Sequence, residues 1–261
     1  MTELTARGKQ VRRDTLRLGI PNGIYHYGGS FSVVEILLAL YDHELNDDDK
    51  VIMSKGHCWI PQVVILRERG LSPGFGPRLD DTTQSCLVGH PFRDEANGIF
   101  ANTGSLGHGM PLGVGMAFAR KLQKRAGRIY VIVGDGEIQE GTFWESLLLA
   151  RKYKLDNLTV IIDYNRIQGS GRVADVLPIP LPRSLSRMLI DDMGWEASVV
   201  NGHDVPHLID TLRWPRSMSR PTMIIAETVK GRGVSFMEDR PEWHAKFPTP
   251  EQLEQAYLEL S

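Results

Sequence analysis

The sequence predicts an α/β protein with a doubly wound, mostly parallel sheet that is covered by helices on both faces. Two observations support this prediction. After residue 106, short apolar runs rich in β-branched residues alternate with amphipathic stretches of helical spacing. The run at 158–164, "LTVIIDY", shows no polar alternation, which is typical of a strand buried on both faces of a parallel sheet.

The same periodicity gives the expected elements. Helices are expected at 3–19, 31–42, 59–70, 107–127, 142–155 and 206–214, and strands at 128–135, 157–165, 195–202 and 221–229. Two stretches rich in Pro, Gly, Asp or Asn, 71–104 and 166–190, are expected to be long irregular loops. We expect a single domain over residues 1–261.

Composition narrows the class of protein. The 261 residues are 41% hydrophobic and 24% charged, as in an ordinary globular protein. A net charge of −2 gives no electrostatic reason to expect nucleic acid or a membrane surface as a partner. The longest apolar stretch, 33–41, is too short to span a bilayer. Two cysteines, Cys58 and Cys86, cannot build a disulfide framework, so a cytoplasmic location is expected.

The segment "VIVGDGEIQEG" at 131–141 raises a chemical question. It places Asp135 between Gly134 and Gly136 directly after a predicted strand. Glycines there let the backbone close on a phosphate, which a carboxylate would repel. The next glycine is Gly141, so the dinucleotide pattern G-x-G-x-x-G is not satisfied.

A metal ion resolves this contradiction. Asn165 ends the next predicted strand, about 30 residues after Asp135, which is the length of one βαβ unit. The two side chains are then expected at the same edge of the sheet, where oxygen ligands of this kind suit Mg²⁺ or Ca²⁺. The expected ligand is a diphosphate carried with its cation. Taken alone, each residue also fits an ordinary turn.

The surrounding motifs are "HYGGSFSVVEILLALY", "SKGH", "GHP", "GSLGHGMPLGVGMAFA", "GDGEIQEGTFWES", "DYNRIQ", "NGHD" and "KGRGVSFMEDRPEWH". Together they resemble the N-terminal, diphosphate-binding half of transketolase, from about residue 8 to 247. The resemblance implies the thiamin diphosphate-binding fold, with thiamine diphosphate and Mg²⁺ as cofactors and Ca²⁺ or Mn²⁺ as alternative metals.

By this resemblance, Asp135, the Asn165 side chain and the Ile167 carbonyl would bind the metal. Gly134 and Gly136 would let the backbone approach the diphosphate. Gly104 and Leu106 would contact the aminopyrimidine ring of the cofactor through their backbone.

Four histidines also match the family's motifs. His57 and His244 would lie near the diphosphate and the reacting carbon, and His26 and His90 would line the substrate channel. Neutral imidazoles suit a reaction whose alkoxides gain and lose protons at neutral pH. Considered singly, each of the four also fits a structural role.

The resemblance further implies a partner. Glu140 would be a buried glutamate that bridges to an acidic residue on a pyrimidine-binding domain, although it also fits a charge at a helix N-terminus. The pyrimidine-binding and C-terminal domains are not among these 261 residues. We therefore expect one subunit of a split transketolase, which works with a C-terminal transketolase subunit in an α2β2 assembly.

The expected reaction is transfer of a two-carbon ketol unit from a ketose, as sugar or sugar phosphate, to an aldose. Two alternatives stay open. One is a related thiamine-dependent transfer, such as that of 1-deoxy-xylulose 5-phosphate synthase or of decarboxylating 2-oxo acid enzymes. The other is a catalytically idle partner subunit.

Other residues favour structural interpretations. His203 and His207 have a spacing that can bind zinc on a helix, but the loop-like "NGHD" argues against it. Cys58 is expected to be a small packing residue. Three features depart from the family near the expected substrate path: Tyr25, "CWIPQVV" at 58–64, and Ala245. They leave the acceptor sugar open.

Overall fold

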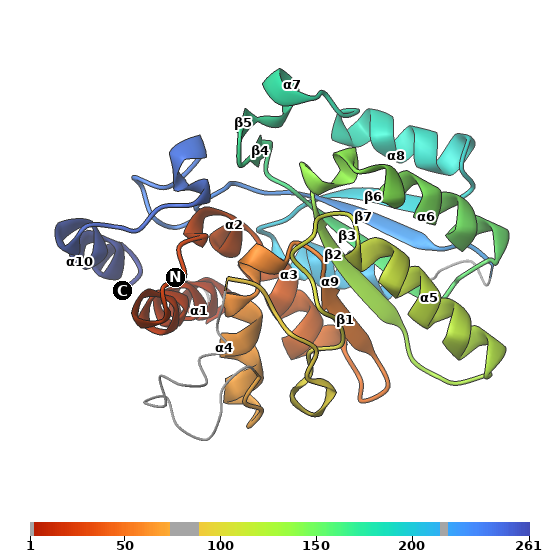
Figure 1. Cartoon of the computed structure of the whole chain (residues 1–261), viewed down its shortest axis with the longest axis horizontal. Coiled ribbons are helices and arrows are strands. Elements are labelled where there is room, and N and C mark those ends of the chain that lie inside the picture. Colours follow the sequence, from red (N-terminus) through yellow and green to blue (C-terminus); the bar gives the residue numbers. More distant parts are fainter. Residues whose placement is uncertain (1–2, 74–88, 215–218) are drawn as a thin grey trace.

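The centre of the protein is a five-stranded sheet in which every neighbouring pair of strands is parallel (Figure 1). In spatial order the strands are β1 (Lys50–Met53), β2 (Ile129–Gly134), β3 (Leu158–Tyr164), β7 (Thr222–Glu227) and β6 (Glu196–Asn201). The computed structural model describes residues 3–73, 89–214 and 219–261. The predicted fold class is confirmed.

Helices cover both faces of the sheet (Figure 1). One face packs against α5 (Gly109–Leu122), α6 (Gly141–Lys152) and α8 (Pro182–Asp191). The core on the other face contains residues of α1 (Glu3–Gly19), α3 (Val34–Leu38), α4 (Ile60–Glu68) and α9 (Val205–Arg213). Two hydrophobic cores result, one on each side of the sheet.

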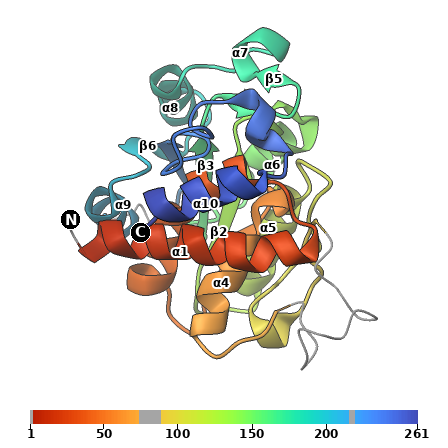
Figure 2. The ribbon, with the colours of Figure 1, turned by 90° about the vertical axis from the view of Figure 1, so that its left-hand side faces the viewer.

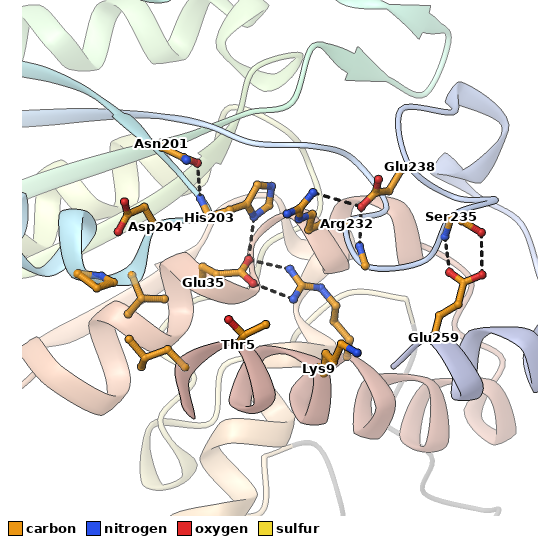
Figure 3. A pocket seen from close by; sticks show the side chains of 15 residues that line it. Thr5, Lys9, Glu35, Asn201, His203, Asp204, Arg232, Ser235, Glu238 and Glu259 are labelled. Carbon is orange, nitrogen blue, oxygen red and sulfur yellow. Dashed lines mark hydrogen bonds and ion pairs between the residues drawn. The ribbon is translucent and has the colours of Figure 1, made fainter. Parts of the chain in front are cut away.

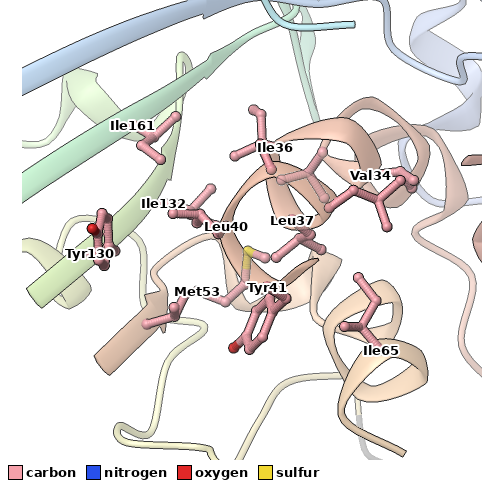
Figure 4. Close-up of a cluster of buried hydrophobic side chains, with 14 of the residues drawn as sticks. Val34, Ile36, Leu37, Leu40, Tyr41, Met53, Ile65, Tyr130, Ile132 and Ile161 are labelled. Carbon is pink, nitrogen blue, oxygen red and sulfur yellow. The ribbon is translucent and has the colours of Figure 1, made fainter. Parts of the chain in front are cut away.

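The strands divide their side chains between these two cores. In β2, Tyr130 and Ile132 join the core that holds α3 and α4, where they face Ile36 and Leu40 (Figure 4). Ile129, Val131 and Val133 join the opposite core. Because successive side chains of a strand point to opposite faces, a continuous apolar run is what a strand covered on both sides requires.

A third core lies beside the sheet and joins the two ends of the chain. Leu16 of α1, Tyr27 and Phe31 of α2 (Tyr27–Ser32), Trp243, and Leu260 after α10 (Pro250–Glu259) pack together there. Figure 2 shows α10 lying alongside α1. Thr249 caps α10 in a reciprocal capping box with Gln252.

Short elements complete the described chain. They are the 3₁₀ turns Ile20–Asn22, Gly56–Cys58, Glu95–Asn97, Glu137–Gln139 and Pro241–His244, the π-helical turn Ala39–Glu44, helix α7 (Val173–Val176), and the antiparallel pair β4 (Ile167–Gln168) and β5 (Gly171–Arg172). No helix in the described parts of the chain is both long enough and apolar enough to cross a bilayer.

Most expected elements are present, with ends shifted by a few residues. The helix expected at 31–42 begins earlier, at Tyr27, and is broken at Val33 between α2 and α3. The helix expected at 107–127 packs closely on the sheet, as its small residues indicated: a Cβ on Gly113 would lie 2.3 Å from Cγ2 of Val131. Strand β1 and helix α10 were not expected.

The expectation of an irregular loop over 166–190 is wrong in its second half. Residues 182–191 form α8, with Pro182 in its first turn. Proline is favoured there because the first N–H groups of a helix need no intrahelical acceptor. Leu185 and Leu189 lie one turn apart and are fully buried in the core beside α6. Of the loop expected at 71–104, residues 74–88 lie outside the described residues.

Candidate active site

The candidate site lies at the carboxyl ends of β2 and β3, where parallel sheets usually bind ligands. Gly134 at the end of β2 pairs with Asp163 near the end of β3. Asp135 follows β2 directly, Asn165 follows β3 directly, and each of these two side chains is almost fully buried. The structure therefore brings the two predicted oxygen ligands to the same edge of the sheet.

A left-handed turn at Arg166 brings the oxygen atoms together. Arg166 has a φ of 69°, and its backbone N–H donates a hydrogen bond to Oδ2 of Asp135. The Gly136 N–H donates to Oδ1 of Asp135 at 2.8 Å, and the Ile167 N–H donates to Oδ1 of Asn165 at 3.1 Å. Backbone groups thus fix both side chains.

The donor set suits a hard cation. Burial, together with the nearby charge of Asp163, raises the pKa of Asp135 to about 6, so a bound cation would stabilise its carboxylate. The buried Oε1 atom of Gln168 has no hydrogen-bond partner among the described residues. Those residues contain no group of three His, Cys, Asp or Glu with metal-binding geometry. The predicted ligands are one carboxylate, one amide oxygen and one carbonyl, which is a magnesium-type set rather than a zinc-type set.

These residues line a cavity of about 300 Å³. The predicted site residues that line it are His57, Leu106, Gly134, Asp135, Gly136, Glu140, Asn165, Ile167 and His244. His26, His90 and Gly104 do not line the cavity but lie beside it. Gly104 packs so tightly on His90 that a Cβ at this position would lie 2.7 Å from the imidazole ring.

The four predicted histidines form one cluster. Ring centroids of His26, His57 and His244 lie 5.2 to 5.6 Å apart, and the ring of His90 lies 6.3 Å from that of His26. Burial lowers the pKa of each of them, to about 4 for His26 and about 3 for His244. The imidazoles are therefore neutral at pH 7.

Two buried lysines, Lys55 and Lys230, line the cavity. The Lys55 ammonium is paired with the fully buried carboxylate of Asp163, which also accepts hydrogen bonds from Ser32 and Thr228. Burial by itself would raise the pKa of Asp163, but these partners lower it, so Asp163 stays ionised.

Lys230 is the second buried lysine. Its Nζ atom donates to the Ile167 carbonyl at 3.1 Å and to Nδ1 of His244 at 3.0 Å. Burial and the charge of Lys55 lower its pKa to about 8. A carbonyl oxygen has two lone pairs, so the Ile167 carbonyl retains one for another ligand.

The two glutamates of "GDGEIQEG" lie in different environments. Glu137 is buried and accepts hydrogen bonds from Ser54, from the Gly107 N–H at 2.9 Å and from the Gly134 N–H at 3.1 Å. It therefore ties the "TGSLGHG" loop to the end of β2. Glu140 stands at the N-cap of α6 and makes no side-chain capping bond. Its side chain is exposed, so the expected burial of Glu140 is not found within this chain.

The remaining histidines and cysteines are not brought into the cavity. His203 contacts Glu35 rather than His207, and His108 is exposed beside Ser105. Cys58 is buried, with Sγ only 2.5 Å from where a Cβ on Gly29 would lie, so it packs as a small residue. Cys86 lies outside the described residues.

Two of the departures from the family lie in different environments. In the segment at 58–64, Trp59, Ile60 and Val63 are fully buried in the core around α4. Tyr25, by contrast, is exposed at the edge of the histidine cluster. Its ring centroid lies 4.5 Å from that of His26 and 5.5 Å from that of Phe247.

Most of the chain matches a known protein family. Residues 39–248 match the family model described as "Transketolase, thiamine diphosphate binding domain". This chain belongs to the transketolase family.

Its relatives in the transketolase family include proteins of similar length. The chain is 39% identical over 270 residues to an apulose-4-phosphate transketolase subunit of Actinobacillus succinogenes, covering 99% of this chain and 96% of that protein. It is 31% identical over 271 residues to the 6-deoxy-6-sulfo-D-fructose transketolase subunit SqwG of a Clostridium species, with 99% and 96% covered.

The fold is shared with longer transketolases. The structure superposes on transketolase from Leishmania mexicana with a TM-score of 0.83, at 22% sequence identity. The match covers 100% of this chain and 41% of that chain.

Sequence reasoning from the transketolase motifs did not single out four buried charged residues, which are Lys55, Glu137, Asp163 and Lys230. A signal for Asp163 was present: it is the only charged residue in a strand that is otherwise apolar or uncharged, "LTVIIDY". A buried charge needs a partner, and Lys55 of "SKGH" supplies it. Which lysine would pair with which carboxylate depends on the spatial order of the strands, which the motifs do not contain.

Proposed function

We propose that this chain is the thiamine diphosphate- and Mg²⁺-binding subunit of a two-component transketolase. The assembly transfers a two-carbon ketol unit from a ketose or ketose phosphate to an aldose. The observation that supports this most is the convergence of Asp135, Asn165 and the Ile167 carbonyl at one edge of the sheet, in a chain of the transketolase family.

The residues around the cavity have the chemistry to hold the diphosphate end of the cofactor. Asp135, Oδ1 of Asn165 and the Ile167 carbonyl would bind Mg²⁺, which Ca²⁺ or Mn²⁺ can replace at an all-oxygen site. Gly134 and Gly136 line this cavity, where their lack of side chains would let the backbone approach the diphosphate, and Lys230 brings a positive charge to the same cavity. Gly104 and Leu106 would contact the aminopyrimidine ring.

When bound, thiamine diphosphate supplies the carbanion that breaks the carbon–carbon bond of the ketose. The histidines of this chain would move the protons. Because Lys230 donates to Nδ1 of His244, the neutral imidazole carries its proton on Nε2 and can donate it to a substrate oxygen. The buried Nδ1 atom of His26 has no hydrogen-bond partner among the described residues, which suits a substrate hydroxyl. His57 and His90 complete the neutral lining.

A partner subunit is the second part of the proposal. Relatives of nearly the same length are named as subunits, which supports a second polypeptide. Glu140 lines the cavity and is exposed, so that it could meet a residue of a pyrimidine-binding domain. Leu112, Leu148 and Leu149 on the neighbouring helices α5 and α6 are also exposed, and exposed apolar side chains of this kind favour a subunit contact. An α2β2 assembly in the cytoplasm, with one thiamine diphosphate-binding domain per chain of this kind, fits these features.

The family match favours ketol transfer over the other thiamine-dependent reactions. It leaves the sugar open, since the names of the two relatives above refer to apulose 4-phosphate and to 6-deoxy-6-sulfo-fructose. The contact between Tyr25 and Phe247 at the histidine cluster is a feature of this chain that bears on which sugar it takes.

The test is reconstitution. The chain is purified alone and together with a candidate subunit that carries a pyrimidine-binding domain, and ketose donors are screened with aldose acceptors by mass spectrometry. We expect no ketol transfer by the chain alone, and transfer by the pair that requires both thiamine diphosphate and Mg²⁺. Turnover by the single chain would reject the split arrangement. Cofactor binding by the pair without turnover of any ketose would support an idle subunit.

A further inference from the structure

A buried network of charged and polar groups lies behind the candidate active site, on the other side of the chain that follows β7. It lines a pocket of about 780 Å³ (Figure 3). Arg12 of α1, Glu35 of α3 and His203 of the "NGHD" segment meet there. None of the three lines the candidate cavity, so the proposed function does not use them.

The network starts from a fixed charge pair. Arg12 donates to both carboxylate oxygens of Glu35 at 2.7 Å and to the Phe31 carbonyl at 2.8 Å. Burial by itself would raise the pKa of Glu35, but Arg12 and the hydrogen bond from His203 lower it to about 2. Glu35 is therefore an anchored anion at neutral pH.

His203 connects this anion to the backbone. Its Nδ1 atom lies 2.9 Å from Oε2 of Glu35, and its Nε2 atom accepts the Val229 N–H at 2.8 Å. Since Nε2 accepts, the neutral imidazole must carry its proton on Nδ1 and donate it to Glu35. Both ring nitrogens are thus used, and the tautomer and the orientation of the ring are fixed.

The residues on either side of Val229 contribute side chains to the candidate site. Thr228, one residue before Val229, donates to Asp163 through its hydroxyl. Lys230, one residue after it, donates to the Ile167 carbonyl and to His244. The segment 228–230 also packs tightly against Gly202, because a Cβ on Gly202 would lie 2.4 Å from Cγ2 of Thr228.

We propose that His203 is a positioning residue for the candidate active site: through the Val229 N–H it sets the place of Lys230 in the cofactor cavity. The role in cofactor binding rests on the proposed function. The charge pair of Arg12 and Glu35 fixes His203, His203 fixes the peptide at Val229, and that peptide determines where the Lys230 ammonium meets the diphosphate end of the cofactor. The "NGHD" motif then contributes to binding without touching any ligand.

The sharpest variant is His203→Asn. An asparagine amide takes the place of Nδ1 and keeps the bond to Glu35, so the buried anion stays paired, but it does not reach Val229. His203→Gln reaches the position of Nε2 and restores an acceptor for the Val229 N–H. His207→Asn is the matched control, because His207 is exposed on α9 and its backbone N–H, rather than its ring, is hydrogen-bonded to Asp204.

The first measurement is hydrogen–deuterium exchange of the full chain without cofactor. We expect His203→Asn to speed exchange of the Val229 amide by at least ~10-fold, since a lost hydrogen bond lowers local protection. His203→Gln and His207→Asn should leave it near the wild-type rate. Unchanged exchange in His203→Asn would overturn the proposal, whether or not the chain proves to bind thiamine diphosphate.

The second measurement is calorimetric titration of the assembled pair with thiamine diphosphate and Mg²⁺. We expect His203→Asn to weaken binding by roughly 10-fold, as loss of a supporting hydrogen bond behind a ligand-binding group does. In a Lys230→Met background the same substitution should change affinity by less than ~2-fold, because coupled residues are not additive. Wild-type affinity in His203→Asn, or an equal loss in the Lys230→Met background, would contradict the role through Lys230. Failure of the wild-type pair to bind the cofactor would instead contradict the proposed function.

Discussion

The strand ends and the histidine cluster of the candidate site differ in whether their ionisable groups are charged. At the strand ends, Asp135 and Asp163 are buried close to Lys55 and Lys230, so fixed charges of both signs lie within one small region. The neighbouring histidine cluster is equally crowded but uncharged, because burial lowers the pKa of every member. Burial opposes ionisation in both places, but the carboxylates and lysines stay charged whereas the imidazoles are neutral.

The difference in charge results from the neighbouring groups of these side chains. Each carboxylate at the strand ends accepts hydrogen bonds from backbone or side-chain donors, which favour its ionised form. The histidines have mainly one another and the two lysines as neighbours, and like charges favour the neutral imidazole. One end is thus suited to holding a charged ligand, and the other to exchanging protons at neutral pH.

Removing the charge at the first end should have the largest effect. We expect Asp135→Asn to weaken Mg²⁺-dependent binding of thiamine diphosphate by the assembled pair by more than ~100-fold, beyond the cost of a lost supporting hydrogen bond. Calorimetric titration measures this. The control is Asp210→Asn on the exposed face of α9, which should bind as the wild type does. Wild-type affinity in Asp135→Asn would show that the cation is held elsewhere.

The neutral histidine cluster should make the free energy of unfolding depend on pH. His26 titrates near pH 4 in the folded chain and near 6.5 when unfolded, so between these values the unfolded state binds more protons. The free energy of unfolding of the wild type should therefore fall, relative to His26→Gln, as the pH drops from about 6.5 to about 4, with unfolding taking up about one more proton in the wild type.

Urea denaturation at a series of pH values measures this difference. His207→Gln, at an exposed position on α9, is the matched control for replacing a histidine with glutamine. A difference between wild type and His26→Gln that does not vary with pH would mean that His26 is solvated in the folded chain.

The smallest effect is expected at Arg166, because only its backbone N–H contacts the candidate site. Arg166 contributes its N–H to Asp135, while its side chain forms an exposed ion pair with Glu227. Arg166→Gly keeps the N–H and suits the φ of 69°. Because an exposed ion pair is worth less than ~1 kcal/mol, we expect unfolding free energy to change by no more than that. Cofactor affinity should stay within ~3-fold of wild type, as for a surface substitution. A larger loss would assign a role to the guanidinium group.

Much of this site could be predicted because it depends on local sequence. Asp135 and Asn165 each follow an apolar run, and the length between them is that of a single crossover connection, so their meeting at one edge follows from the chirality and the parallel pairing of such units. The helix at 182–191 was missed because the prolines at 178, 180 and 182 resemble those of a loop, and only the burial of Leu185 and Leu189 decides otherwise.

The sequence by itself determined the fold class, the edge of the sheet at which Asp135 and Asn165 meet, and the family's motifs, because these depend on the spacing of apolar, glycine and acidic residues along the chain. The tertiary structure decided which charges are paired. Asp163 with Lys55, and Glu35 with Arg12 and His203, come from segments far apart in the sequence. Their partners depend on strand order and helix packing, and a buried charge is stable only once those partners are in place.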